Sequence, residues 1–316
     1  SDLLDVFFIV AFFLFGLIFG SFLNVCIHRM PRELSVVRPR SACPACHQLI
    51  AAYDNIPVLS WLLLGGKCRH CRAAISPRYA AVELLTGLLF SLSYYVASHE
   101  AATQIEANSY DVFALAIKYS ICCFLLLGLI FTDAETKLLP DLLTKPGIVL
   151  GLLFSLLVKM PEPPPLLFRS MLSGRILWLA NSIAGVLFGS AFLLGIALLY
   201  QAVRGVEGMG RGDVKLMALI GAFLGMWLTL LVLVLGTLVG TIFGILMIVI
   251  VWRKRLARRR SRKAEPPAVA RARAWQSAKL IYRNFEIPFG VFLGTAALVA
   301  LFCGSRLLNW YLGLYQ

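Results

Sequence analysis

Two aspartates stand where apolar stretches of the chain meet short polar segments, and both are candidates for chemistry. Asp133 ends one apolar stretch, and Asp213 begins another directly after Gly210 and Gly212. A carboxyl group in a membrane-buried helix is costly, so it is a functional candidate by default. Two such groups brought together can share one proton and activate a water molecule, one as base and one as acid. The pair therefore predicts general acid–base hydrolysis.

Each aspartate also has an ordinary structural interpretation. Asp213 precedes an apolar run and could simply cap the helix that begins there. Asp133 ends an apolar run, where a carboxylate opposes the helix dipole, so capping does not account for it. Gly210 and Gly212 permit unusual backbone angles and the close approach of a substrate chain. The rival carboxyl of Asp141 is better explained as a cap of the next helix.

Three further charged residues are candidates for supporting roles. Glu83 is embedded in an apolar stretch, where it could bind a positive group of a substrate or pair with a basic residue. Lys137 and Lys215 lie close in sequence to the two aspartates. They could tune the carboxyl groups or bind substrate.

The apolar composition places these residues in a membrane protein. Of the 316 residues, 59% are hydrophobic and only 15% are charged. Apolar runs of about 20 residues recur, and each is long enough to cross a bilayer as a helix. We expect eight such helices, near residues 4–27, 78–97, 111–132, 142–158, 177–202, 213–228, 229–252 and 286–308. The predicted class is an all-α polytopic membrane protein.

Two details refine this prediction. The sixth and seventh helices are separated only by Gly225-Met226-Trp227, so a tight turn is expected there. The first apolar run lacks a basic n-region and an A-x-A-like cleavage site. We therefore expect it to be retained as a membrane helix.

Four of the eight cysteines form a second candidate site. Cys43 and Cys46 are separated by two residues, as are Cys68 and Cys71. Two such knuckles can surround one tetrahedral ion with four thiolates, and zinc is the usual ion. His47 or His70 could substitute, but four thiolates already complete the ligand set. The closed set leaves no position for water, so we expect a structural zinc that stabilises a loop with little core of its own.

The alternative to zinc is a pair of disulfides, and the charge of the loops decides against it. The basic loops are 28–77, 203–212 and 253–285, whereas 98–110 contains no Lys or Arg. Basic loops are cytoplasmic, which places the N-terminus outside and the cysteines in a reducing compartment. The same topology puts Asp133 and Asp213 at cytoplasmic helix ends. Loop 159–176 fits poorly, because its basic residues fall on the outer side.

The net charge of +14 raises the question of nucleic acid. Its densest basic run, 253–263, follows an apolar stretch directly. We expect this run to anchor the topology and to contact anionic lipid headgroups, and no nucleic acid is expected as a partner. Residues 260–275, rich in Arg, Ala and Pro, are expected to be mobile.

The predicted organisation follows from these points. It consists of a first transmembrane helix (1–27), a cytoplasmic zinc-binding insertion (28–77), a second helix with an outer loop (78–110), a membrane domain with both aspartates (111–252), a basic cytoplasmic loop (253–285) and a last helix with the C-terminus (286–316).

The chain resembles the bacterial prepilin peptidases, also called type IV leader peptidases, over nearly its whole length. The matching blocks are Gly20–Pro31, the cysteine module, Ile75–Tyr79 with Glu83, the Asp133 block ending in Leu139-Pro140-Asp141, Gly208–Lys215 and Ile287–Gly290. The resemblance implies an intramembrane aspartic protease of the Gly-x-Gly-Asp kind in the bacterial inner membrane. By residue match, Asp133 and Asp213 are its catalytic pair.

The resemblance also implies substrates and a second reaction. The substrates would be prepilins and the pseudopilins of type II secretion, cut on the cytoplasmic side after a glycine that ends a basic leader. Many members then methylate the new N-terminus with S-adenosylmethionine, an activity associated with the cysteine module. Glu83 and the cytoplasmic segment are the places to look for that activity.

Two other functions would account for part of the sequence. A proton-coupled transporter would use embedded aspartates, but it predicts inverted repeats and carboxyls near the bilayer centre. A membrane scaffold could use the zinc loop to recruit a partner, but it leaves the glycine-flanked aspartate unexplained.

Overall fold

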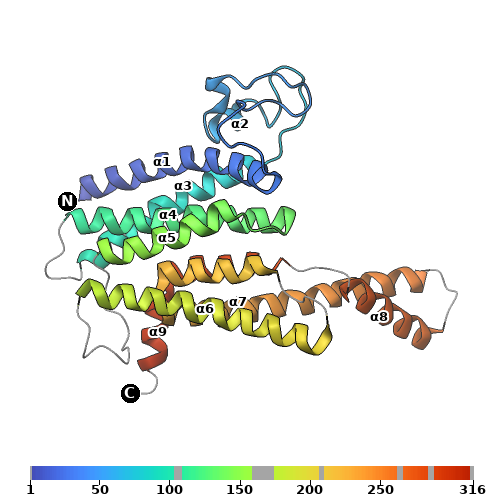
Figure 1. Ribbon diagram of the computed structural model, residues 1–316. Coiled ribbons are helices and arrows are strands. Elements are labelled where there is room, and N and C mark those ends of the chain that lie inside the picture. The colour runs from blue at the N-terminus through green and yellow to red at the C-terminus, as the bar shows by residue number, and fades with distance from the viewer. Residues whose placement is uncertain are drawn as a thin grey trace.

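The computed structural model of the protein describes residues 2–102, 109–158, 174–205, 210–261, 266–283 and 288–313. Within these ranges the regular structure is helical and no strand occurs, so the all-α class is confirmed. The longer helices are α1 (Asp2–Arg29), α3 (Arg78–Ala102), α4 (Ser109–Thr136), α5 (Asp141–Leu157), α6 (Gly174–Arg204), α7 (Arg211–Ser261), α8 (Pro267–Arg283) and α9 (Phe289–Gly313), with the short α2 (Leu59–Leu63) between α1 and α3 (Figure 1).

Six of the described helices are long and apolar enough to span a membrane, namely α1, α3, α4, α6, α7 and α9. The protein is therefore a multi-pass membrane protein. Helix α5, with 17 residues, corresponds to the fourth expected span but is shorter than these six. Of the expected loops 98–110 and 159–176, residues 103–108 and 159–173 lie outside the described residues, and the described remainder is helical.

The two helices expected at 213–228 and 229–252 are the two parts of α7. The break comes at Gly225, at the start of the expected turn, where φ is 76° and ψ is 178°. Only glycine adopts such a backbone readily. The amide oxygen of Asn181 on α6 accepts the N–H of Met226 at 3.1 Å. This hydrogen bond satisfies a donor that the break exposes.

Small residues let the first two long helices pack closely. A Cβ atom at Gly16 would lie 2.7 Å from the Cα of Gly87, and one at Gly20 would lie 2.7 Å from the Cα of Glu83. Glycines four residues apart put a flat surface on one side of a helix, so that α1 and α3 approach along their backbones. This contact fixes where α3, and hence Glu83, lies relative to α1.

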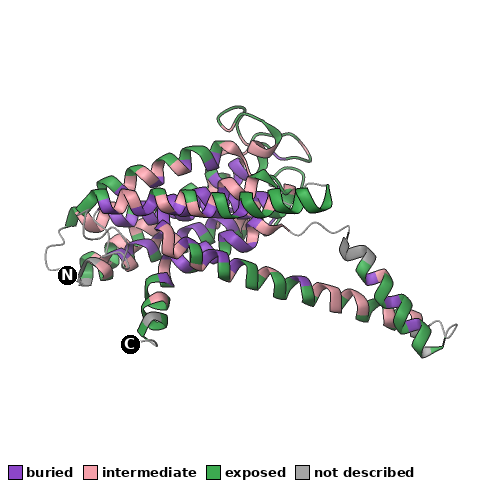
Figure 2. Cartoon of the chain, turned by 60° about the horizontal axis from the view of Figure 1, so that its bottom comes forward, coloured by how far each residue is buried: buried purple, intermediate pink, exposed green. Residues whose placement is uncertain are grey.

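Helix α4 lies at the centre of the bundle, packed against α1, α3, α5 and α9. Its buried side chains include Leu126 and Leu129, which belong to the main apolar core together with Leu219 of α7 and Leu293 of α9. Figure 2 shows this core as the band of buried residues through the middle of the molecule. The helix continues four residues beyond its expected end at 132, so Asp133 lies inside its last turn.

The basic segment after residue 252, which includes the stretch 260–275 expected to be mobile, is helical over most of its described part. Helix α7 continues to Ser261, and α8 packs against it (Figure 1). Ala270, Ala274 and Ala278 are buried at four-residue intervals, the spacing of one helix face. The rings of Trp252 and Trp275 meet edge to face at 6.4 Å. These contacts explain why the described part of this charged stretch is helical.

Candidate active site and metal centre

The last turn of α4 positions Asp133. Its side chain is only 5% exposed. The helix ends where Lys137 adopts a positive φ of 56°, and the Lys137 N–H donates to the carbonyl oxygen of Asp133 at 2.9 Å. The charge of Lys137 also acts on the Asp133 carboxyl. The carboxyl group is therefore held at the end of the bundle and not at its centre.

The beginning of α9 supplies the principal partner of Asp133. The N–H of Val291 donates to Asp133 Oδ2 at 3.0 Å, from a residue 158 positions away in the sequence. The first N–H groups of a helix have no partner within it and carry partial positive charge. A Cβ atom at Gly290 would lie only 2.8 Å from Asp133 Oδ2. Glycine at position 290 therefore allows the carboxylate to reach the helix end.

Asp213 lies in the first turn of α7. The helix begins at Arg211, and the Asp213 N–H donates to the carbonyl oxygen of Gly210 at 3.2 Å. Asp213 is therefore already inside the helix and does not occupy the capping position. Gly212 packs against the side chain of Leu139, which a Cβ atom there would approach to 3.1 Å.

The structure brings the two aspartates together. Helix α9 packs against both α4 and α7, the helices that carry them. The negative charge of Asp133 acts on the carboxyl group of Asp213, which is partly buried. The two groups are thus electrostatically coupled at one end of the bundle.

Lys215 does not turn toward either aspartate of this pair. Its Nζ lies 2.5 Å from Asp141 Oδ1, and Lys145 Nζ lies 2.7 Å from the other oxygen of the same carboxyl. Asp141 is the first residue of α5 and makes these ion pairs, while the capping position belongs to Pro140, which has no side-chain cap. The expected cap at Asp141 is therefore replaced by a link between α5 and α7.

Glu83 holds the backbone of the insertion between α1 and α3. Its Oε2 accepts the N–H of Val58 at 2.7 Å. Val58 has φ 60° and ψ −51°, a strained conformation for a β-branched residue. The described partners of Glu83 are thus this backbone N–H and the side chain of Ser21, where the sequence suggested a substrate or a basic side chain. Nearby, Arg78 and Glu135 form an ion pair that joins the start of α3 to the end of α4.

The four cysteines of the insertion come together as one cluster. Their Sγ atoms all lie within 4.8 Å of one another, and those of Cys43 and Cys71 are 3.8 Å apart. A tetrahedral zinc site with Zn–S bonds of about 2.3 Å has S–S edges of about 3.8 Å. The donor set and its spacing fit zinc. All four thiols are free of disulfides.

The two knuckles share one backbone design. The N–H of His47 donates to the carbonyl of Cys43, and the N–H of Arg72 donates to that of Cys68, at 2.8 and 3.0 Å. Both His47 and Arg72 have φ near +60°. The N–H groups of Cys46 and Ala45 hold the pKa of the Cys43 thiol at about 6, below the usual 9.0. The pKa of Cys46 shifts the other way, to about 11, so the four thiols do not ionise alike. Cys43 is the ligand that the fold favours as a thiolate.

One part of the aspartate site escaped the sequence analysis. The block Ile287-Pro288-Phe289-Gly290 was recognised, but no role could be given to it, and Ile287 lies outside the described residues. The available signal was a proline followed closely by glycine at the start of an apolar run, which is typical of a helix beginning that must approach another group. Its partner on α4 could not be identified from sequence.

Comparisons with known proteins identify the family of the chain. Residues 14–97 match the bacterial peptidase A24 N-terminal domain, and residues 120–245 match the type IV leader peptidase family. No solved structure matches significantly.

Several relatives carry the name prepilin leader peptidase/N-methyltransferase. The relative from Aeromonas salmonicida is 35% identical, over 95% of this chain and 92% of its own length. The relative from Pseudomonas aeruginosa is 32% identical, over 96% and 93%. The relative from Klebsiella pneumoniae is 38% identical, over 67% and 83%. On these matches, the chain belongs to the type IV leader peptidase family.

Proposed function

We propose that the protein is a membrane-embedded aspartic endopeptidase with Asp133 and Asp213 as its catalytic pair. Its substrates are type IV prepilins and the pseudopilins of type II secretion, from which it removes the basic leader. The observation that carries the proposal is the placement of two carboxyl groups at one end of the bundle, Asp133 in the last turn of α4 and Asp213 in the first turn of α7, with α9 packed against both helices. The names of the relatives support the choice of substrate.

The geometry suggests different roles for the two acids. Asp133 receives the N–H of Val291 at the beginning of α9, a setting that favours a negative charge. We therefore assign Asp133 as the base that takes a proton from the attacking water. Asp213, which faces that charge, donates a proton to the oxygen of the scissile carbonyl. The water oxygen forms the new bond to carbon. The C–N bond then breaks as the peptide nitrogen takes the proton held by Asp133, and the former carbonyl oxygen returns its proton to Asp213.

The placement of the site suits a substrate with a basic leader and an apolar helix. The helix would remain in the bilayer while the leader stays outside it, so the scissile bond would lie near the membrane surface. Both aspartates lie near helix ends, at this level. A proton-coupled transporter would instead have its carboxyl groups near the bilayer centre. Membership in the peptidase family also argues against a transporter.

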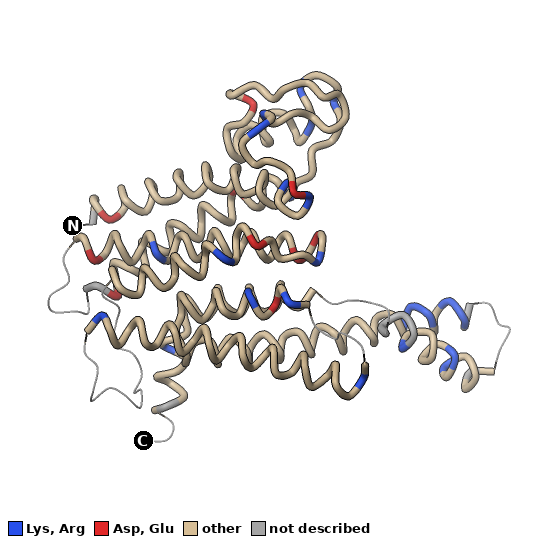
Figure 3. Tube along the Cα trace, viewed as in Figure 1, with Lys and Arg blue, Asp and Glu red and all other residues tan. Residues whose placement is uncertain are grey.

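We also propose an orientation in the bacterial inner membrane. Most of the Lys and Arg positions lie toward the end of the bundle that carries the insertion, the starts of α3 and α7, and the α7–α8 hairpin (Figure 3). The positive-inside rule places this end in the cytoplasm and the N-terminus outside. The basic run 253–263 would then contact anionic lipid headgroups, with no nucleic acid as partner.

Zinc would be held by Cys43, Cys46, Cys68 and Cys71. It would supply no chemistry to peptide cleavage, because four thiolates complete its coordination. Its role is to fold the insertion, whose polar contacts include the ion pair of Arg69 with Asp54 at 2.5 Å.

The methylating activity in the names of the relatives implies S-adenosylmethionine as methyl donor, and we propose that this chain methylates the new N-terminus. The pockets beside the insertion do not fit that molecule. Arg29 and Arg40 line one of them, and none of the described lining residues is acidic. Besides its carboxylate, the methyl donor carries a sulfonium and an ammonium group, and these linings offer neither cation an acidic partner. No residue is therefore assigned to methyl transfer.

The test is cleavage of a prepilin by the purified protein in detergent, followed by mass spectrometry of the product. Asp133→Asn and Asp213→Asn should each abolish cleavage while the protein remains folded. Asp141→Asn is the matched control, because it changes a carboxyl in the same region that pairs only with lysines, and it should retain cleavage. Normal cleavage by either of the first two variants would refute the assignment. A further mass increase of one methyl group, dependent on S-adenosylmethionine, would report the second activity.

A further inference from the structure

The cysteine insertion lies beside α1 and not only beyond its end. Ile56 and Pro57 of the insertion line a pocket of about 500 Å³ together with Ile18, Ser21 and Phe22 of α1. Ile18 precedes the end of α1 at Arg29 by 11 residues, a depth of about 16 Å along the helix. Figure 1 accordingly shows α2 above the last third of α1. This part of the insertion therefore reaches the level of the membrane-spanning segment.

The same part of the insertion presents apolar side chains outward. Ile56, Leu59, Leu62 and Leu63, here called the α2 apolar patch, are all exposed, Leu63 to 78%. A contiguous apolar surface of this kind marks contact with a partner or a membrane. Phe22, which lines the adjoining pocket, is also an exposed apolar side chain of α1. The α2 apolar patch thus adjoins the exposed apolar surface of α1.

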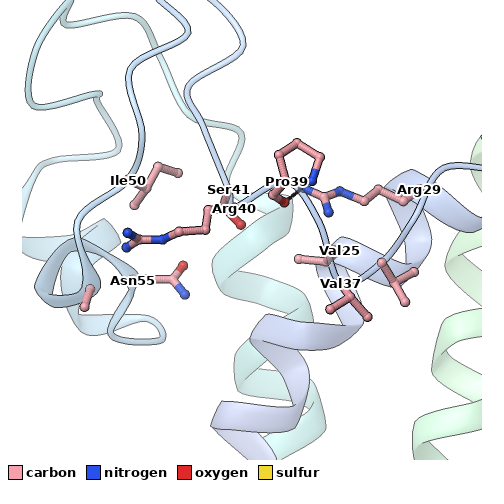
Figure 4. A pocket seen from close by; sticks show the side chains of 10 residues that line it. Val25, Arg29, Val37, Pro39, Arg40, Ser41, Ile50 and Asn55 are labelled. Carbon is pink, nitrogen blue, oxygen red and sulfur yellow. Dashed lines mark hydrogen bonds between the residues drawn. The ribbon is translucent and has the colours of Figure 1, made fainter.

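A second pocket, of about 300 Å³, joins the first, and the two share Val25 and Asn55. Its lining is basic, with Arg29 and Arg40, as Figure 4 shows. Arg29 donates to the carbonyl oxygen of Pro39 at 2.8 Å and so fixes the loop that carries Arg40. None of the described residues that line either pocket is acidic.

A basic pocket continuous with an apolar one has the chemistry of a phospholipid with an anionic headgroup. We propose that these two pockets bind one such lipid, with its phosphate at Arg40 and an acyl chain along Ile18 and Phe22. The α2 apolar patch enters the same leaflet. The charge of Arg29 lies behind the phosphate and reinforces the site. The cysteine insertion is then a membrane-seated element whose position depends on an anionic lipid.

Native mass spectrometry of the delipidated full-length protein in detergent tests the headgroup site. Phosphatidylglycerol should bind more tightly than phosphatidylcholine with the same acyl chains. Arg40→Gln should weaken phosphatidylglycerol binding about fivefold, equivalent to about 1 kcal/mol for one cationic group. It should weaken phosphatidylcholine binding less, because the choline of that lipid already neutralises its phosphate. Arg38→Gln is the matched control, because Arg38 is exposed in the same loop but lines neither pocket. It should bind both lipids as the parent protein does.

A photo-cross-linking experiment tests the depth of the insertion. Leu62→p-benzoylphenylalanine, irradiated in phosphatidylglycerol vesicles, should form a lipid adduct, as should the same probe at Phe7 on the exposed surface of α1. Equal loss of lipid in the Arg40 and Arg38 variants, no headgroup preference, or no adduct at position 62 would each overturn the proposal. Loss of S-adenosylmethionine binding in place of lipid binding in Arg40→Gln would also overturn it and would identify the pocket as the methyl donor's. Prepilin cleavage is a separate readout, so these results leave the peptidase assignment untouched.

Discussion

Replacing Gly290 by alanine tests whether α9 positions the carboxyl group of Asp133. The added Cβ would lie 2.8 Å from Asp133 Oδ2, where an ordinary contact needs about 3.4 Å, so the oxygen must move by about 0.6 Å. Movement of this size away from the helix would stretch the 3.0 Å bond from Val291 to about 3.6 Å, beyond hydrogen-bond range. The change is small in space but falls on one reacting group.

The expected loss can be estimated from that hydrogen bond. A hydrogen bond to a charged group contributes about 1.5–3 kcal/mol, and each 1.36 kcal/mol corresponds to a tenfold change in rate. Gly290→Ala should therefore lower kcat/KM for prepilin cleavage by about 10- to 150-fold. Alanine is a better helix former than glycine by about 1 kcal/mol, so the unfolding temperature in detergent should not fall.

The control is Gly240→Ala, in α7 beside α9. The nearest atom to its added Cβ is a ring carbon of Phe292 at 3.5 Å, an ordinary contact, so cleavage should be unchanged. A Gly290→Ala protein that is folded and cleaves at the parent rate would refute the positioning role of α9. If the variant lost cleavage because it was unfolded, its unfolding temperature would fall. That result would not support the positioning role of α9.

Three further perturbations probe other parts of the structure. Gly225→Ala should lower the unfolding temperature, because a φ of 76° is strained for alanine and the added Cβ would overlap the amide of Asn181. The expected cost in unfolding free energy is about 1–3 kcal/mol. An unchanged unfolding temperature would contradict this. Glu83→Ala removes the acceptor of the Val58 N–H, so the insertion should be held less firmly and trypsin should cleave it faster at Lys67. Cleavage at the parent rate would show that this hydrogen bond is dispensable. Zinc should be released on acidification, because protons compete with the metal for the four thiolates. Bound zinc itself favours the thiolate form, so release should need a pH below the pKa of about 6 of the free Cys43 thiol. Zinc that stays bound in strong acid, measured with a chromophoric chelator, would argue against a thiolate site.

The helices were largely predictable because apolar run lengths report directly on membrane spans. Every expected span has a helical counterpart, and the run at Gly225-Met226-Trp227 located the break in α7 to within a few residues. The cysteine spacing likewise anticipated the cluster, because the two knuckles are local structures that need few long-range contacts. The charged helix α8 was missed, since its composition resembles that of a loop and only the four-residue spacing of three alanines signals packing.

The partners of the charged groups were less predictable. Lys215 lies two residues from Asp213, yet it pairs with Asp141, 74 residues away in the sequence. Glu83 accepts a backbone N–H, and any residue except proline can supply such a donor, so the sequence does not indicate which residue it is. The capping of α9 by Asp133 joins segments that adjoin only once the helices have packed. Such pairings depend on tertiary geometry, which residue type and local spacing do not specify.

The dependence of Asp133 on Val291 has a consequence for biosynthesis. Both acids precede α9 in the chain, so the donor that secures Asp133 is made after both of them. A nascent chain in which the helices up to α7 have inserted would contain both carboxyl groups but not the N–H of Val291. Hydrolytic competence would then arise only once α9 has been made and has packed against α4.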